Sequence, residues 1–479
     1  MRERDTIRAI ALATALLAGL TGCTGGAGSS SRSSASAATG GSSGGSGSGG
    51  STGASSGSST GSGSSSGSST GSSTGSGSGA SAPTAFERFA TLRQQVAGLA
   101  TAQQQAQLDA FIAAQAATDE GFPLRFGTRA AFVWEGTPQG APVVAGDFDA
   151  WNQSSLTLAR IGQTTVWFAE ATLGADRYEY KLIVDGSWTA DPLNRKFSYN
   201  YGNSVANMAG SGKSHLEKLA GFRSATLGNA RDVLCYFPAG YLDEAPARYP
   251  VIYMHDGQNL FDPGAFYGGW GVDATLDGLI AQGAVKKVIV IGPANTPDRM
   301  SEYTHCQDDL SSRCDGSQVT GGKAALYADF LVNELKPAID ARYRTLTGRD
   351  DTAVIGSSLG GLVSLWIAYA HPGFARNVGG MSSTFDWGAF CPHSPPRQTM
   401  QDIVAAAGKQ SFAIYLDSGG SASGGGDNYQ TTVDLRDLLL SQGFQYNADL
   451  SYYWDPNGTH DEADWRARFD KPVRFWFHK

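Results

Sequence analysis

A serine between glycines is the residue of this chain best placed for covalent chemistry. The run Gly356-Ser357-Ser358-Leu359-Gly360 follows the apolar segment AVI and leads into the apolar helical pattern LGGLVSLWIAYA. A G-x-S-x-G match on a strand-to-helix turn holds its serine in a strained backbone conformation. We therefore predict that Ser358 is a nucleophile and that side chains at Gly356 and Gly360 would crowd it. The alternative is a glycine-rich turn with a bystander serine.

A serine hydroxyl needs a base to take its proton, and the base needs an acid to orient it. Sites built on such a turn present these groups in the order serine, acid, histidine. His460 lies in WDPNGTHDEADW, a polar turn after the strand-like DLSYYW, whereas His478 is the penultimate residue. His371 and His393 precede the acid and so stand in the wrong order. His460 is the predicted base.

The acid should follow the strand-like segment SFAIYL. Asp417 closes that segment, and Asp427 comes ten residues later, after SGGSASGGG. Asp427 is the predicted acid, because its loop gives the carboxylate room to reach the imidazole. Asp417 is the rival, and Asp461 should point elsewhere.

The negative oxygen that forms at an attacked carbonyl needs hydrogen-bond donors. The backbone N–H of Leu359, directly after the serine, should supply one. The segment YMHDGQNLFD should supply the other through the N–H of Gln258, where Gly257 permits a tight backbone. The alternative is that HDGQN is an ordinary β-turn, which Asp-Gly chemistry also explains.

These residues need a scaffold, and residues 218–479 predict an α/β domain. Apolar strands such as YPVIYMH, KKVIVIG and SFAIYL alternate with helical segments. Such alternation is typical of a mainly parallel sheet covered on both faces. Ligands of such sheets bind beyond the carboxyl ends of the strands, where the candidate residues stand.

Two different textures precede this domain. Residues 83–125 show helical spacing and predict a helical lead-in of one or two helices. Residues 126–210 hold short strands separated by Gly, Asp and Asn turns, the pattern of an all-β, immunoglobulin-like sandwich. The segment AGSGKSH should connect the sandwich to the α/β domain.

The N-terminus predicts export and a lipid anchor. Arginines flank an apolar run too short to span a bilayer, and the run ends in LTGC. Residues 1–23 resemble a bacterial lipoprotein signal, with Cys23 as the lipidated residue. Residues 24–82 are almost entirely Ser, Gly, Thr and Ala, which predicts a disordered linker. The protein should therefore be an exported lipoprotein, periplasmic or on the cell surface.

The chain has five cysteines, so lipidation of Cys23 would leave four for pairing. Three pairings are possible. We expect Cys306 with Cys314, which closes a short loop, and Cys235 with Cys391.

Charge and spacing exclude several classes of protein. The formal net charge is -8 and no long basic run is present, which argues against a nucleic-acid partner. The histidines show no metal-ligand spacing, and no dinucleotide fingerprint follows a strand. We expect neither a metal nor an organic cofactor.

From about residue 232 onward the chain resembles the putative-esterase family of α/β-hydrolases, which includes enterochelin, feruloyl and acetyl-xylan esterases and S-formylglutathione hydrolases. The resemblance rests on VIYMHDGQNLFD, PDRMSEYTH, VNELKPAID, AVIGSSLGGL, HPGFARNVGGMSS and GTHDEADWRARF. It implies Ser358 as nucleophile, Asp427 as acid and His460 as base. The long SGGSASGGG insertion departs from the usual short turn of the family.

The β-rich segment resembles the glycogen-binding type of carbohydrate-binding module through VVAGDFDAWNQ, YEYKLIVDGSWTADPLN and GNSV. Related sandwiches also precede the hydrolase domain of enterochelin-type esterases. The resemblance implies that Trp151 and Trp188 stack on sugar rings and that Lys181 and Asn203 bind hydroxyls. The alternative is that both tryptophans are packing residues.

Together these features predict an exported serine esterase that hydrolyses carboxylic esters through an acyl-enzyme. The substrate would be a small-molecule or polysaccharide-linked ester, with feruloyl and acetyl esters favoured by the tether and the sandwich. One alternative is a siderophore esterase, although an intracellular one would have no use for an export signal. Others are acyl transfer to a sugar hydroxyl and a non-catalytic, glycan-binding surface lipoprotein.

Overall fold

The computed structural model describes residues 82–421 and 426–479. The predicted signal peptide with Cys23, and the predicted linker up to residue 81, lie outside the described residues. Residues 83–479 belong to one compact unit. Among the described residues, no helix is both long and apolar enough to cross a bilayer.

The helical lead-in forms two helices, α2 (Ala85–Val96) and α3 (Thr101–Ala116). Thr84 caps α2, because its hydroxyl accepts from the N–H of Glu87 and its own N–H donates to the Glu87 carboxylate. The apolar faces of both helices pack on one sheet of the sandwich through Phe89 and Leu108.

The expected β-rich segment is a sandwich of antiparallel strands. The first sheet has the order β1-β2-β6-β5: Leu124–Phe126, Arg129–Glu135, Val166–Thr172 and Ala159–Arg160. The second centres on β7 (Arg177–Val184) and adds β3 (Val143–Gly146), β4 (Leu156–Thr157), β8 (Ser187–Thr189), β9 (Lys196–Phe197) and β10 (Ser204–Asn207). Strand β2 is buried on both faces, since the other sheet covers Phe132 and the helices cover Val133.

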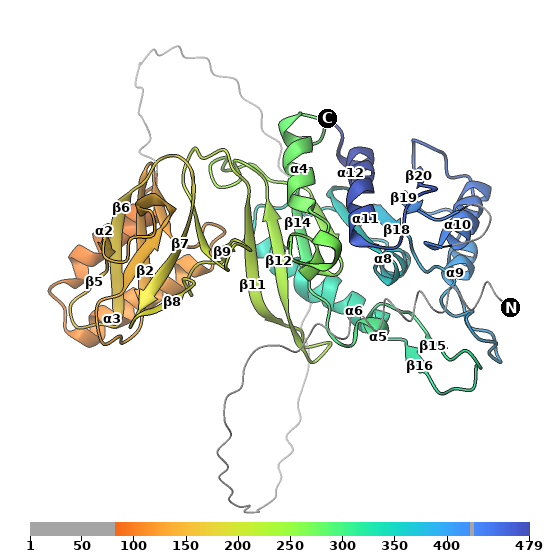
Figure 1. Ribbon diagram of the computed structural model, residues 1–479, viewed down its shortest axis with the longest axis horizontal. Helices are drawn as coiled ribbons and strands as arrows, with labels where there is room; N and C mark the ends of the chain where they lie inside the picture. The colour runs from red at the N-terminus through yellow and green to blue at the C-terminus, as the bar shows by residue number, and fades with distance from the viewer. Residues whose placement is uncertain (1–81, 422–425) are drawn as a thin grey trace, which may run out of the picture. The chain divides into compact units, whose positions relative to one another are not determined.

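The second sheet continues into the α/β domain without a break in its hydrogen-bonded path. Strand β9 pairs with β11 (His215–Arg223), with Glu217 opposite Lys196, and β11 pairs with β12 (Ala230–Phe237). The two predicted domains therefore share one sheet (Figure 1).

The α/β domain has the expected mainly parallel sheet. Its order is β20-β19-β18-β17-β13-β14-β12-β11, and only the pairs of β12 are antiparallel. The parallel strands are Leu450–Trp454, Ala413–Ser418, Asn377–Met381, Thr352–Ser357, Val251–Met254 and Ile289–Pro293, from β20 to β14. All but β20 are buried along their whole length, as strands covered on both faces should be.

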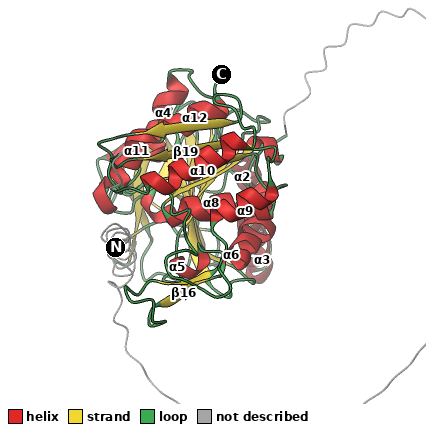
Figure 2. Ribbon diagram, turned by 90° about the vertical axis from the view of Figure 1, so that its right-hand side faces the viewer, coloured by secondary structure: helices red, strands yellow, loops and turns green. Residues whose placement is uncertain are grey.

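Helices cover both faces of this sheet (Figure 2). Ile252 and Met254 face one core, which α4 (Val272–Ala281), α11 (Glu462–Arg468) and α12 (Asp470–Phe477) complete. Val251 and Tyr253 face the other core. Its helical segments are α6 (Ala324–Asp329), a π-helical turn (Phe330–Leu335), α7 (Lys336–Arg342), α8 (Leu359–Ala370), α9 (Met400–Ala407) and α10 (Tyr429–Ser441).

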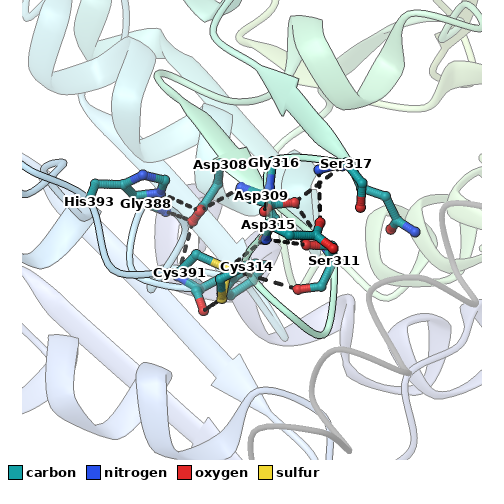
Figure 3. Close-up of a disulfide and its surroundings, with 12 residues drawn as sticks. Asp308, Asp309, Ser311, Cys314, Asp315, Gly316, Ser317, Gly388, Cys391 and His393 are labelled. Atoms are coloured by element: carbon teal, nitrogen blue, oxygen red, sulfur yellow. Dashed lines mark hydrogen bonds and ion pairs between the residues drawn. A yellow bond between two sulfur atoms is a disulfide. The ribbon is translucent and has the colours of Figure 1, made fainter.

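The expected cysteine pairing is wrong. A disulfide joins Cys314 to Cys391, while Cys235 and Cys306 are free thiols. Cys235 lies on β12, fully buried in the central sheet, where it cannot approach a surface loop. The disulfide ties the loop between β15 (Gln307–Asp309) and β16 (Val319–Gly321) to the loop after β18 (Figure 3).

The same junction holds a contact between a histidine and a buried aspartate. Asp308 accepts from the backbone N–H groups of Gly388 and Phe390, and its other oxygen lies 2.9 Å from His393 Nε2 (Figure 3). His393, which the order of the chain excludes as a base, therefore has a structural partner. A short helix, α5 (Arg299–Glu302), precedes β15.

Candidate active site

Ser358 sits at the turn between β17 and α8 with a left-handed backbone, φ +56° and ψ −122°. Such a conformation is costly for a residue with a Cβ and persists only where the surroundings impose it. Its N–H donates to Met381 O at 2.9 Å, and its carbonyl accepts from Leu362 N at 3.2 Å. The turn thus holds the serine at the carboxyl end of β17.

Two glycines make this turn possible, and one of them differs from the prediction. A Cβ at Gly356 would lie 2.8 to 2.9 Å from backbone atoms of Gly360, so only glycine fits there. A Cβ at Gly360 would instead meet His255 at 3.4 Å, an ordinary contact. The crowded residue is Gly361, where a Cβ would lie 1.8 Å from Ser383 Oγ. The helix therefore needs its second glycine one residue later than expected.

The predicted base and the predicted acid are in direct contact. His460 Nδ1 lies 2.8 Å from Asp427 Oδ1, and both side chains are almost fully buried. A proton on Nδ1 in this contact would leave Nε2 as the proton acceptor. The Trp465 ring meets the imidazole edge-on at a centroid distance of 5.0 Å.

Asp417, the rival acid, makes other contacts. It is fully buried at the end of β19, accepts from Tyr415 Oη at 2.9 Å and lies 3.5 Å from Arg468 Nε. Burial raises the pKa of Asp417 to about 7, against the opposing charge of Arg468. Asp461 points away from the imidazole as expected, because its carboxylate caps α11 through the N–H groups of Ala463 and Asp464.

The acid and base loops meet through two glycines. A Cβ at Gly419, just after β19, would lie 2.4 Å from Gly458 O and 2.6 Å from Asp427 Oδ2. Gly420 N also donates to Gly458 O at 3.0 Å. This close approach brings residue 427 and residue 460 together although 33 positions separate them.

The predicted oxyanion donors lie on adjacent turns. Gln258 belongs to the 3-10 turn Gly257–Asn259 that follows β13, and β13 is the parallel neighbour of β17. A Cβ at Gly257 would lie 2.0 Å from Gly292 O, which explains the glycine. The Gln258 side chain is held by Asn295 N at 3.0 Å. Leu359 begins α8, where the first N–H groups have no partner within the helix.

Charged residues flank these turns. Asp256 pairs with Arg299 through two bonds of 2.8 Å. Burial acts to raise the pKa of Asp256, but the charge and hydrogen bonds of Arg299 outweigh it and leave that pKa below its ordinary value. Glu462 accepts from Asn259 Nδ2 at 3.2 Å, and burial raises its pKa.

Three residues at this edge were not assigned a role from the sequence. All three are buried: Ser382 and Arg468 bond to the outer oxygen of Asp427, and Trp465 bonds to the Ser382 hydroxyl. Ser382 had a signal, because it is the first polar residue after the strand NVGGM. Trp465 and Arg468 had none beyond their nearness to His460 in the chain. Across the described ranges, no cluster of three or more His, Cys, Asp or Glu residues has metal-binding geometry.

The predicted sugar-binding residues share one face of the sandwich. The rings of Trp151 and Trp188 lie 6.0 Å apart at 48°, and Trp188 is 41% exposed. Lys181 Nζ donates to Tyr201 O at 2.8 Å. Asn203 is buried, and its amide donates to Glu179 at 2.8 Å. Trp188 is exposed and Trp151 is half-buried, whereas the two polar side chains already have partners within the protein.

Comparison with known families agrees with both halves of the chain. Residues 224–476 match the family described as "Putative esterase", and residues 128–213 match the glycogen recognition site of AMP-activated protein kinase. The β-rich segment is thus of the glycogen-binding type.

Individual relatives are distant. The uncharacterized protein YbbA of Bacillus subtilis (strain 168) is 25% identical over 158 residues, which are 33% of this chain and 58% of that protein. The ferric enterobactin esterase of Salmonella typhimurium is 19% identical with a TM-score of 0.42, covering 73% of this chain and 93% of that one. A ferulic acid esterase is 17% identical with a TM-score of 0.42, covering 55% and 98%. Likenesses this remote carry no argument about substrate. The first family match spans more than half of the chain, and the protein therefore belongs to the putative-esterase family of α/β-hydrolases.

Proposed function

We propose that this protein is a carboxylic ester hydrolase that works through an acyl-enzyme on Ser358. The observation that carries the proposal is the 2.8 Å bond between His460 and Asp427, formed at the same sheet edge as the strained Ser358 turn. A buried carboxylate bound to Nδ1 fixes the tautomer in which Nε2 is the proton acceptor. Family membership agrees with this chemistry.

In the proposed reaction, Ser358 Oγ attacks the ester carbonyl as His460 Nε2 takes its proton. The N–H groups of Leu359 and Gln258 stabilise the negative oxygen of the tetrahedral intermediate. His460 then protonates the departing alcohol. A water molecule, activated by the same imidazole, releases the acid and frees Ser358. Asp427 keeps the imidazole oriented and stabilises its charged form throughout.

We further propose that the protein acts outside the cytoplasm, anchored to a membrane by lipid on Cys23 and the Gly/Ser-rich linker that follows. The charged, apolar and small-residue blocks of residues 1–23 support export. A tethered enzyme that also has a sandwich of the glycogen-binding type favours polysaccharide-linked feruloyl or acetyl esters. Siderophore lactones are the competing substrate class.

Glycan binding by the sandwich is a second, separable function. The exposed Trp188, tilted against the half-buried Trp151, supports it, because exposed aromatic faces stack on sugar rings. Lys181 and Asn203 would have to exchange their present partners for sugar hydroxyls.

The test is an activity screen of the full chain on p-nitrophenyl acetate, feruloylated and acetylated polysaccharides, and a catecholate lactone. Hydrolysis with a burst of p-nitrophenol equal to the enzyme concentration is the expected result. No turnover on any of these, together with retention on a glycan column, would favour the non-catalytic binding protein instead.

A further inference from the structure

The end of β18 connects the proposed nucleophile to the proposed acid. Met381 O accepts from Ser358 N at 2.9 Å, and Thr384 N approaches Ser358 O at 3.4 Å. Between them, Ser382 Oγ donates to Asp427 Oδ2 at 2.7 Å. Residues 381–384 therefore contact both the serine turn and the acid.

The Ser382 hydroxyl has only one way to direct its proton. Trp465 Nε1 lies 3.1 Å and Arg468 Nη2 lies 2.9 Å from Ser382 Oγ, and both groups can only donate. They occupy the two acceptor positions of the hydroxyl. Its single hydrogen must then go to Asp427. Ser382 is fully buried, so water does not compete for these positions.

The acid needs such support because its loop is strained. Gly426, Asp427 and Asn428 are three consecutive residues with left-handed φ, at +87°, +47° and +55°. Only the first of them is a glycine, which tolerates this region freely. Ser382 also fastens the loop through its carbonyl, which accepts from Asn428 Nδ2 at 2.7 Å.

Arg468 lies between the carboxylates of Asp417 and Asp427. Its Nε lies 3.5 Å from Asp417 Oδ1 and its Nη2 lies 3.3 Å from Asp427 Oδ2, so one buried guanidinium serves two buried carboxylates. Each would be costly to bury without this opposite charge. Asp417, the rival acid, thus shares Arg468 with the Asp427 carboxylate.

We propose that Ser382, with Arg468 and Trp465 behind it, is a positioning residue that sets the orientation of the Asp427 carboxylate. Oδ2 is held by Ser382, Arg468 and the N–H of Gly419, which prevents rotation of the carboxylate and turns Oδ1 to His460. The inference rests on the proposed function, since it concerns the acid of that reaction.

The experiment removes the hydroxyl in the full chain by two routes. Ser382→Ala keeps the Cβ, and Ser382→Gly also suits the left-handed φ of +46° at this residue. We expect kcat on p-nitrophenyl acetate to fall roughly ten- to a hundredfold, and kcat/KM to fall equally, because orientation is lost rather than binding. Ser364→Ala is the matched control, since this buried serine bonds only to Gly360 O within its own helix in the contacts of the described chain.

A double-mutant cycle separates positioning from a general structural role. In an Asp427→Ala background, Ser382→Gly should cause no further loss of kcat, because its effect passes through the missing carboxylate. Losses that multiply would overturn the inference. So would an unchanged kcat in folded Ser382→Gly, or loss of the native melting transition in both Ser382 variants.

Failure of the inference and failure of the proposed function give different results. If Ser358→Ala abolishes turnover while Ser382→Gly leaves it unchanged, only the role of Ser382 is wrong. If Ser358→Ala retains full turnover, the acyl-enzyme proposal itself fails.

Discussion

The chain carries two sets of residues that family resemblance marks as functional, and the structure treats them differently. At the carboxyl edge of the parallel sheet, the loops after β17, β19 and β20 converge and join His460 to a buried Asp427. On the outer sandwich face, formed by Trp151, Lys181, Trp188 and Asn203, the two polar side chains bond to the protein's own Tyr201 and Glu179. In the first set the polar atoms are turned toward each other, whereas in the second they are bonded to residues outside the set.

Left-handed backbone occurs in both regions. At the carboxyl edge, Ser358, Ser382 and Asp427 all have left-handed backbones, and neighbouring hydrogen bonds hold each of them. Strain of this kind is concentrated at functional sites. On the outer sandwich face, Trp151 is left-handed at φ +61°, with its indole bonded to Asp147.

The largest expected effect is on the serine. Ser358→Ala should lower turnover by roughly four to six orders of magnitude, because the attacking hydroxyl is removed. Steady-state kinetics and a thermal melt check this, and the melt should stay close to that of the parent. Retention on a glycan column should not change. Loss of both hydrolysis and glycan retention in this variant would mean that the two regions do not act independently.

The next effect separates the two carboxylates. Asp427→Asn should reduce kcat by roughly a thousand- to ten-thousandfold, because the imidazole loses its orienting charge. Asp417→Asn, of the same size and chemistry, should cost less than about tenfold, since the Asp417 carboxylate contacts Tyr415 and Arg468 rather than the imidazole. Comparable losses in the two variants would mean that the acid has been assigned to the wrong residue.

A smaller effect concerns pH and stability. Burial raises the pKa of Asp417 to about 7, above its unfolded value of 3.8. The folded state then binds more protons in this window, so the contribution of Asp417 to stability is present at low pH and is lost as pH rises toward 7. The free energy of unfolding of Asp417→Asn, relative to that of the parent, should therefore rise by about 2 kcal/mol from pH 5 to pH 8. Urea unfolding at the two pH values measures it, and a constant difference would contradict the shift.

The smallest effect is on the outer sandwich face. Trp188→Ala should weaken retention on a linear α-glucan roughly tenfold, because one stacking surface is lost. Hydrolysis of p-nitrophenyl acetate should be unchanged. Lys181→Ala is the comparison variant, and it should matter less, because Lys181 already bonds to Tyr201 O. If Trp188→Ala has no effect on retention, the tryptophan pair is packing alone.

The sequence was sufficient for the parts of the fold that periodicity and turn chemistry encode. The alternation of apolar strands and helices predicted the parallel sheet, and chain order with strand position selected His460 and Asp427, which the structure joins. The sequence did not predict which distant segments come into contact. The cysteine pairing failed because loop length does not show that Cys235 is inside the sheet. The G-x-S-x-G motif predicted crowding at Gly360, but the crowded residue is Gly361, because the deciding neighbour, Ser383, comes from another strand end.

The role of Ser382 shows the same limit. A polar residue after a strand was visible in HPGFARNVGGMSS, but its three partners come from segments 45 to 86 positions away. The continuous sheet through β9 and β11 was equally invisible, because the composition changes where the hydrogen bonding does not.

The most direct test of the central claim is mass spectrometry of the full chain after treatment with a serine-reactive fluorophosphonate. One adduct should form, on the peptide that contains Ser358, at a rate that His460→Ala lowers by at least about a hundredfold. Turnover of an ester by protein that carries no adduct, or an adduct on a different serine that abolishes turnover, would contradict the account.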